Sequence, residues 1–174
     1  FNRYVYGLNN PYKFTDPDGR EIKVVGSDEF KKAVAENIAR IQEGKGGAAL
    51  ISKLEATEHV ITIKETSGGN SAQAASLDST VPGKGSDSTV NFNPSSTTGG
   101  TDSKGSDQRP AYVGLAHELG HARAMDLGKQ STDSGIGKPG TTPPSEVQSM
   151  ANENMVRKEH DLPERPSYYK NEEP

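Results

Sequence analysis

Apolar residues in this chain gather in short segments, which long polar stretches separate. Helical spacing of apolar positions, with Ser27 as a capping residue, predicts a helix from Asp28 to about Glu43. Weaker helical patterns mark further segments at 48–56, 110–127 and 145–160. Alternating β-branched and polar residues predict strands at 21–25, 59–65 and 89–92. The order of these elements predicts a small α+β domain, with a short twisted sheet packed on the helix at 110–127 and on the C-terminal helix.

The polar stretches between these elements are rich in Gly, Ser, Thr and Pro, and they lie at 67–88, 94–107 and 128–144. Segments so poor in apolar residues bury too little surface to offset their ordering entropy, so we expect long loops, with 67–88 as a mobile insertion. Loops around one helix suggest a cleft that closes on an exposed loop of a folded protein. The strand at 89–92 would lie nearest this cleft, either as an edge that pairs with a peptide or inside the sheet.

Composition narrows the possible functions. The 174 residues suffice for one domain, and a hydrophobic content of only 30% predicts a small core. The net charge of −4, without a dense basic run, argues against binding to nucleic acid. No segment approaches the roughly 18 apolar residues of a membrane span. The chain has no cysteine, so any metal must be held by His, Asp or Glu.

The candidate chemistry lies in the segment AHELGHARAMDLG, which contains two of the four histidines. His117 and His121 are four residues apart, so a helix projects both from one face, as two ligands of one zinc ion require. Glu118 is offset by about 100° around the helix, where its carboxylate can act as a general base on the attacking water. This HExxH pattern predicts a zinc hydrolase.

A catalytic zinc usually has three protein ligands, so one more residue is needed. The extended metzincin pattern is excluded, because Ala124 and Leu127 stand where it requires Gly and His. His59 reads as a sheet histidine, and His160 stands at a helix end, where it can interact with the helix dipole. Asp126 faces the opposite side of the zinc-binding helix.

The remaining candidates for the third ligand are two glutamates of the last helix. Glu146 and Glu153 are seven residues apart on a shared face, separated by roughly 10 Å, so only one of them can bind the metal. Glu146 follows His121 by 25 positions, which leaves a loop long enough to bring a second helix back against the first. The residues alone leave both glutamates open.

The first 20 or so residues carry a resemblance of their own. The stretch NRYVYGLNNPYKFTDPDGR resembles the end of the conserved core of Rhs/YD-repeat proteins, in which a repeat shell encloses a variable C-terminal toxin. The resemblance implies that residues 1–19 end such a core and that 20–174 form a toxin domain. It also implies an Rhs shell in the full-length protein, a cognate immunity protein, and delivery into a target cell by a contact-dependent system such as type VI secretion.

A second resemblance covers about residues 110–169. HELGHA together with SEVQSMANENMVRKEHDLPERPSYY is similar to the effector metallopeptidases of bacterial secretion systems, family M91. It implies a zincin-like domain of the gluzincin type, in which Glu146 is the third zinc ligand. It also implies supporting or substrate-positioning roles for Glu153, Asn154 and Arg157. The family's paired acids are here Ser145-Glu146, which keeps Glu153 as the alternative ligand.

These patterns lead to two hypotheses. In the first, the chain is a zinc endopeptidase toxin that hydrolyses a target-cell protein, with Glu118 as the base and a tyrosine or Arg157 steadying the oxyanion. The candidate tyrosines are Tyr112, Tyr168 and Tyr169. In the second, it is a non-catalytic zinc-binding interaction module. The intact Glu118 argues against the second, because zinc binding alone does not need that residue.

Overall fold

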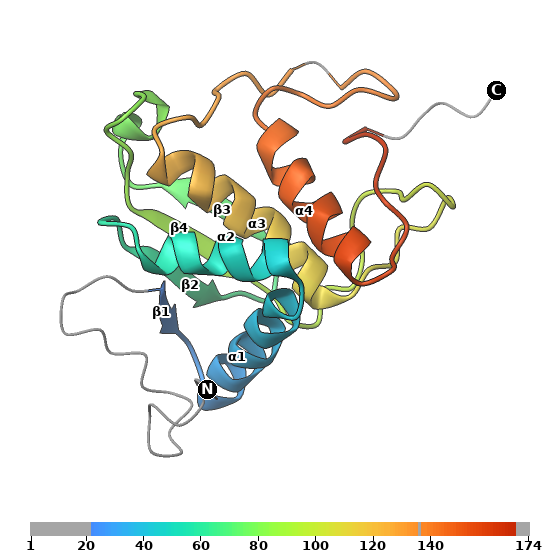
Figure 1. Ribbon diagram of the computed structural model, residues 1–174, viewed down its shortest axis with the longest axis horizontal. Coiled ribbons are helices and arrows are strands. Elements are labelled where there is room, and N and C mark those ends of the chain that lie inside the picture. The colour runs from blue at the N-terminus through green and yellow to red at the C-terminus, as the bar shows by residue number, and fades with distance from the viewer. Residues whose placement is uncertain (1–21, 136, 170–174) are drawn as a thin grey trace.

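The computed structural model describes residues 22–135 and 137–169. The expected boundary at residue 19, between an Rhs core and the following domain, lies outside the described residues. Within them, the chain forms a four-stranded sheet with helices α1 to α4 and a short 3-10 helix, which confirms the α+β prediction (Figure 1). No helix in the described part has the length and apolar character needed to cross a membrane.

The sheet combines the three predicted strands with one that the sequence pattern missed. β1 (Ile22–Val25), β2 (Ile61–Glu65) and β4 (Ser88–Phe92) run parallel, and β3 (Ser71–Ala74) pairs antiparallel with β4. The order is β1-β2-β4-β3, so β4 is interior, and β1 and β3 form the two edges. Of the two positions considered for the strand at 89–92, the interior one is therefore correct.

The first two helices supply much of the apolar core. α1 (Asp28–Gln42) begins where the Ser27 hydroxyl accepts a hydrogen bond from the Phe30 amide at 3.1 Å, as its sequence predicted. α2 (Lys45–Glu55) begins three residues before the predicted start. Their fully or almost fully buried side chains face α3 and the sheet, and they are Phe30, Val34, Ile41, Leu50, Ile51 and Leu54.

α3 (Ala111–Asp126) is the central element, and it lies between the sheet and α4 (Val147–Glu159) (Figure 1). Nearly every residue of α3 is buried, because the sheet, α1, α2 and α4 all pack around it. Pro110 is the residue before its first turn rather than a member of that turn. Gly128 follows its end with a φ of 65°, a left-handed conformation suited to glycine.

Two of the polar stretches are more ordered than expected, and the interpretation of 67–88 as a mobile insertion is wrong. That segment contains β3, the first residue of β4, and a 3-10 helix at Leu77–Thr80. In 94–107, the Asp102 carboxylate accepts hydrogen bonds from the Lys104 and Ser106 amides at 2.8 and 3.0 Å. Backbone and side-chain hydrogen bonds, which composition does not reveal, supply the order here.

Candidate metal centre and active site

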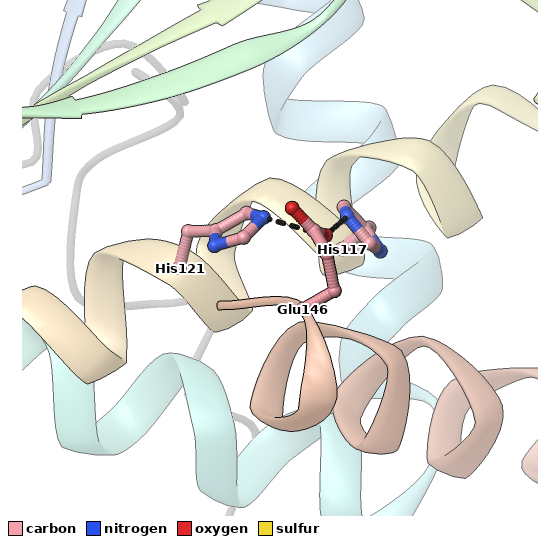
Figure 2. A group of neighbouring side chains, drawn as sticks. All are labelled: His117, His121 and Glu146. Carbon is pink, nitrogen blue, oxygen red and sulfur yellow. Dashed lines mark hydrogen bonds and ion pairs between the residues drawn. The ribbon is translucent and has the colours of Figure 1, made fainter. Parts of the chain in front are cut away.

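Two histidines of α3 and one glutamate at the start of α4 converge on one point. The Glu146 Oε2 atom lies 3.1 Å from His117 Nε2 and 3.2 Å from His121 Nε2 (Figure 2). One potential ligand atom from each residue lies within 4.8 Å of the others, and the imidazoles are almost buried. This is a group of donors that could hold a metal ion.

The close approach of α3 and α4 makes this convergence possible. A Cβ atom on Gly120 would lie 2.8 Å from the Ser149 Cα, so a side chain there would push the two helices apart. Glu146 is the residue that precedes the first turn of α4, facing the two histidines. The glycine between the histidines, which costs helix stability, therefore serves the contact between helices.

Glu153 lies on the other side of His117, away from the ligand cluster. Its Oε2 atom is 3.0 Å from His117 Nδ1, and its side chain is fully buried. Arg157 donates from Nε to Glu153 Oε1 at 2.9 Å, and Arg165 donates from Nη1 to Oε2 at 3.4 Å. A carboxylate that receives the second ring nitrogen of a metal-binding histidine fixes the ring and its tautomer.

Glu118 is buried beside the cluster without belonging to it. It lines two adjacent cavities of about 320 and 280 Å³, which share Asn70, His117 and Tyr168 as further lining residues. Burial raises the pKa of Glu118, against the opposing effect of the nearby histidines. A carboxylate with a raised pKa at the wall of a cavity is suited to proton transfer.

The ionisable groups of the cluster hold each other in charged form in the metal-free protein. Burial by itself would lower the pKa of His117, but hydrogen bonds to Glu146 and Glu153 raise it to about 9. Burial would raise the pKa of Glu146, but hydrogen bonds with His117 and His121 lower it to about 2. The pKa of Glu153 is likewise lowered to about 2, chiefly by His117. Two carboxylates thus compensate a buried imidazolium.

Of the three candidate tyrosines, Tyr168 is the one that lines the cavities. Its ring stacks near His117, with centroids 6.4 Å apart, and the Arg165 guanidinium lies 4.7 Å from its centroid. Tyr169 contacts Tyr168 edge-on. Tyr112 instead packs on His160, with a centroid distance of 4.8 Å. The geometry therefore brings only Tyr168 to the cavity walls.

The residues excluded from metal binding by their sequence positions also lie apart from the cluster. His59 Nδ1 is 2.9 Å from Asp126 Oδ1, and Asp126 also pairs with Arg123 at the far end of α3. His160 ends α4.

Sequence reasoning missed two arginines and the segment that carries one of them. Helical and strand patterns predict no element at residues 162–169, yet Arg165 and Ser167 are buried there. The Asn154 side chain holds this segment against α4. It accepts a hydrogen bond from the Arg165 backbone amide at 2.7 Å and donates one to the Arg165 backbone carbonyl at 2.8 Å. Arg109 lies in the wall of the larger cavity. Both arginines precede a proline, but that gives no signal for a site.

The fold defines a class. The chain is similar to the light chain of Clostridium botulinum neurotoxin serotype F, with 16% identity and a TM-score of 0.51 over 79% of this chain and 48% of that one. The described domain thus spans about half of the neurotoxin chain. Its architecture is that of a small α+β domain similar to a zincin-like metallopeptidase.

The sequence defines the family. Residues 18–150 match the model of the peptidase family M91, which is described as an effector protein. The chain therefore belongs to this family of effector peptidases. No curated protein matches it significantly.

Proposed function

We propose that this chain is a zinc-dependent endopeptidase that acts as an effector on a protein of a target cell. The observation that carries the proposal is the convergence of two imidazoles and one carboxylate next to a buried glutamate outside their cluster. Membership of a peptidase effector family supports both the reaction class and the delivery into another cell.

The residues present fit a zinc ion. Ligand atoms placed about 2 Å from a tetrahedral zinc lie about 3.3 Å from one another, close to the 3.1 and 3.2 Å between the Glu146 carboxylate and the two imidazoles. His117, His121 and Glu146 would hold the ion, and Glu153 would orient His117. When bound, zinc supplies Lewis acidity, which polarises a peptide carbonyl and lowers the pKa of water.

The residues of the chain supply the remaining steps. Glu118 accepts the proton of the attacking water and then donates it to the nitrogen of the leaving amine, which breaks the peptide bond. Tyr168 is the tyrosine placed to donate a hydrogen bond to the oxyanion, and Arg165 holds its ring in position. Arg157 is not assigned this role, since its guanidinium bonds to Glu153 and to the Pro163 carbonyl.

An extended peptide has a backbone partner beside the site. Ser71 and Ala72, at the start of the edge strand β3, line the smaller cavity together with Glu118 and Glu146. Within the described residues no strand pairs with the outer edge of β3, so a substrate strand can pair there, a role considered above for the strand at 89–92. We infer a polypeptide substrate, supplied by an exposed loop of a folded protein.

By resemblance, the proposal also includes a context in a longer protein. Residues 1–19 would end an Rhs core whose shell encloses the domain, and a cognate immunity protein would bind it in the producing cell. Type VI secretion is one route by which such a shell would reach its target.

The substitution Glu118→Gln tests the proposed function. Cleavage of a protein or peptide substrate should fall by about 10²- to 10⁴-fold, because the amide cannot accept the proton. Zinc content should stay at one ion per chain, since Glu118 is no ligand. Glu36→Gln, the same change at an exposed position of α1, is the matched control. Undiminished cleavage by the Glu118 variant would contradict the mechanism, and zinc binding without any cleavage by the unaltered chain would favour the interaction module.

A further inference from the structure

The larger cavity beside Glu118 has a wall that the proposed reaction does not use. Its volume is about 320 Å³, and it lies between α3 and the segment 96–100, with Asn70 and Arg109 among its lining residues. The side chain of Arg109 is only 9% exposed. A buried guanidinium at the wall of a cavity needs a partner, because burial of an uncompensated charge is costly.

Arg109 differs from the other two arginines around Glu153. Arg157 donates to Glu153 and to a carbonyl, and Arg165 donates to Glu153 and to two carbonyls. Within the described residues, the Arg109 guanidinium makes only an ion pair to Glu153 at 3.7 Å, and its buried Nε–H has no hydrogen-bond partner. Burial lowers the pKa of Arg109, although the charges of Glu153 and Glu118 act in the opposite direction.

A second unpartnered donor lies in the same wall. The Asn70 Oδ1 atom accepts a hydrogen bond from the Asn93 amide at 2.9 Å, which assigns the other side of the amide group as the donor. The buried Asn70 Nδ2 has no partner among the described residues. Asn70 and Arg109 therefore each have a buried donor without an acceptor among the described residues, and both residues line one cavity.

The position of Arg109 is fixed by its surroundings. A Cβ atom on Gly99 would lie 2.6 Å from the Arg109 Nη2 atom, and one on Gly114 would lie 3.2 Å from the guanidinium. Two glycines thus leave space for the planar group between α3 and the segment that carries Gly99. A guanidinium held in this way binds a carboxylate with little loss of side-chain entropy.

We propose that this cavity is a substrate subsite for a carboxylate and that Arg109 determines this specificity. The inference rests on the proposed peptidase function and specifies its substrate: a polypeptide with an acidic side chain close to the scissile bond. Glu118 also lines the cavity, so the bound carboxylate lies within a residue or two of the reacting carbonyl. The guanidinium of Arg109 and the amide of Asn70 donate to it.

Paired peptides test the subsite. A mixed library of peptides with acetylated and amidated ends is first cleaved, and mass spectrometry locates the cleaved bond. Pairs of peptides that differ only by Glu or Gln at one flanking position then give the ratio of kcat/KM for the Glu peptide to that for the Gln peptide. We expect the unaltered chain to prefer Glu at one position by roughly tenfold or more, because a charge-assisted bond is lost with Gln. Peptides with a free C-terminus show whether a terminal carboxylate serves equally well.

Variants assign the preference to Arg109. Arg109→Gln should bring the Glu-to-Gln ratio of kcat/KM close to one, and Arg109→Glu should favour Lys at that position. Lys104→Gln removes the same charge from an exposed position in the same loop and should leave the ratio unchanged. Asn70→Asp keeps the acceptor for the Asn93 amide and adds a negative charge, so it should reduce the ratio even where an Arg109 variant fails to fold.

The possible results distinguish a failure of the acidic subsite from a failure of the proposed peptidase function. Efficient cleavage without any acidic preference overturns the subsite and leaves the peptidase intact. An equal loss on both peptides in Arg109→Gln, with normal zinc content, also overturns it, because Arg109 then acts on the reaction itself. If the unaltered chain cleaves no peptide, the proposed function fails. The subsite can then still be tested by the binding of the paired peptides to the Glu118→Gln protein, measured by fluorescence anisotropy. Tighter binding of the Glu peptide supports the subsite, and equal binding of both peptides overturns it.

Discussion

Apolar side chains pack on one side of α3, and charged side chains pack on another. On one side, α1 and α2 cover it with aliphatic and aromatic side chains such as Phe30, Val34 and Leu54. On the other, α4 and residues 162–169 meet it through charged groups: Glu153 lies fully buried among Arg109, Arg157 and Arg165. Both sides exclude water, but only the second does so with groups that need specific partners.

The two sides of α3 therefore respond differently to the loss of one side chain. Apolar packing depends on volume and tolerates small changes in shape, and the loss of one side chain costs a limited amount. A buried charge network depends on each partner, because removal of one leaves others uncompensated. Both sides therefore stabilise the domain, and the charged side also sets where the ligand at the start of α4 lies.

The largest expected effect comes from the two glutamates of α4. Glu146→Ala should abolish stoichiometric zinc binding, because it removes a ligand. Glu153→Ala should weaken binding by about 10- to 100-fold, as expected for a partner outside the ligand set. Metal analysis after dialysis, with zinc titrations, measures both. If only the Glu153 variant loses zinc, the ligand assignment is wrong.

The same Glu153→Ala change should also destabilise the fold. Three buried arginines lose their common carboxylate, at a cost of about 3–5 kcal/mol. Leu54→Ala, on the apolar side of α3, should cost about 2–5 kcal/mol and leave the zinc affinity of the folded protein unchanged. Chemical denaturation of metal-free and zinc-loaded protein gives these free energies of unfolding. A large loss of zinc affinity in Leu54→Ala would show that the two sides of α3 are not separable.

A smaller effect is expected from pH in the metal-free protein. The pKa of His117 is about 9 in the folded chain against an ordinary 6.5, so its stabilising contribution is complete below pH 6.5 and disappears as the pH rises through 9. Glu146, with a pKa of about 2 against 4.5, contributes above pH 4.5 and loses its effect towards pH 2. The free energy of unfolding should therefore be highest between about pH 4.5 and 6.5.

The zinc-loaded protein is the control for that profile. Protons compete with zinc for the imidazoles, so its stability should rise as the pH increases from 5 to about 7. Between pH 6.5 and 9, a fall in the stability of the metal-free protein with little change in the zinc-loaded protein would support the described cluster of His117 and Glu146. A metal-free protein that is equally stable at pH 6 and pH 9.5 would contradict it.

The smallest effect should come from shortening the chain. A chain that begins at Arg20 keeps β1 and all later elements, so it should unfold cooperatively and bind one zinc ion. Thermal unfolding by circular dichroism and metal analysis measure this. Loss of cooperative unfolding would show that the first 19 residues belong to the domain.

The sequence predicted the helices and strands whose own residues carry a periodic pattern. α1 was predicted because Phe30, Val34 and Ile41 recur on one face. The pattern of α3 was weaker, since a helix buried all round has no amphipathic stripe. β3 was missed because its sequence, SAQA, lacks β-branched residues and is stabilised by pairing with β4.

The site was predictable where spacing along a helix places the groups, as for His117, Glu118 and His121. Glu146 and Glu153 could be named but not separated, because the choice depends on how α4 docks on α3. Arg109 and Arg165 reach the site through loops, and no periodicity in one sequence brings their side chains together.

α4 is held at both ends by glutamates, in different ways. Glu146 faces the histidines at the first end, and at the other Glu159 accepts hydrogen bonds from the Gly46 and Gly47 amides in the first turn of α2. The second attachment binds the positive end of a helix dipole and needs no metal. α4 is therefore anchored at its last residue by contacts that need no metal, whereas the position of its first end depends on the contacts of Glu146 with His117 and His121.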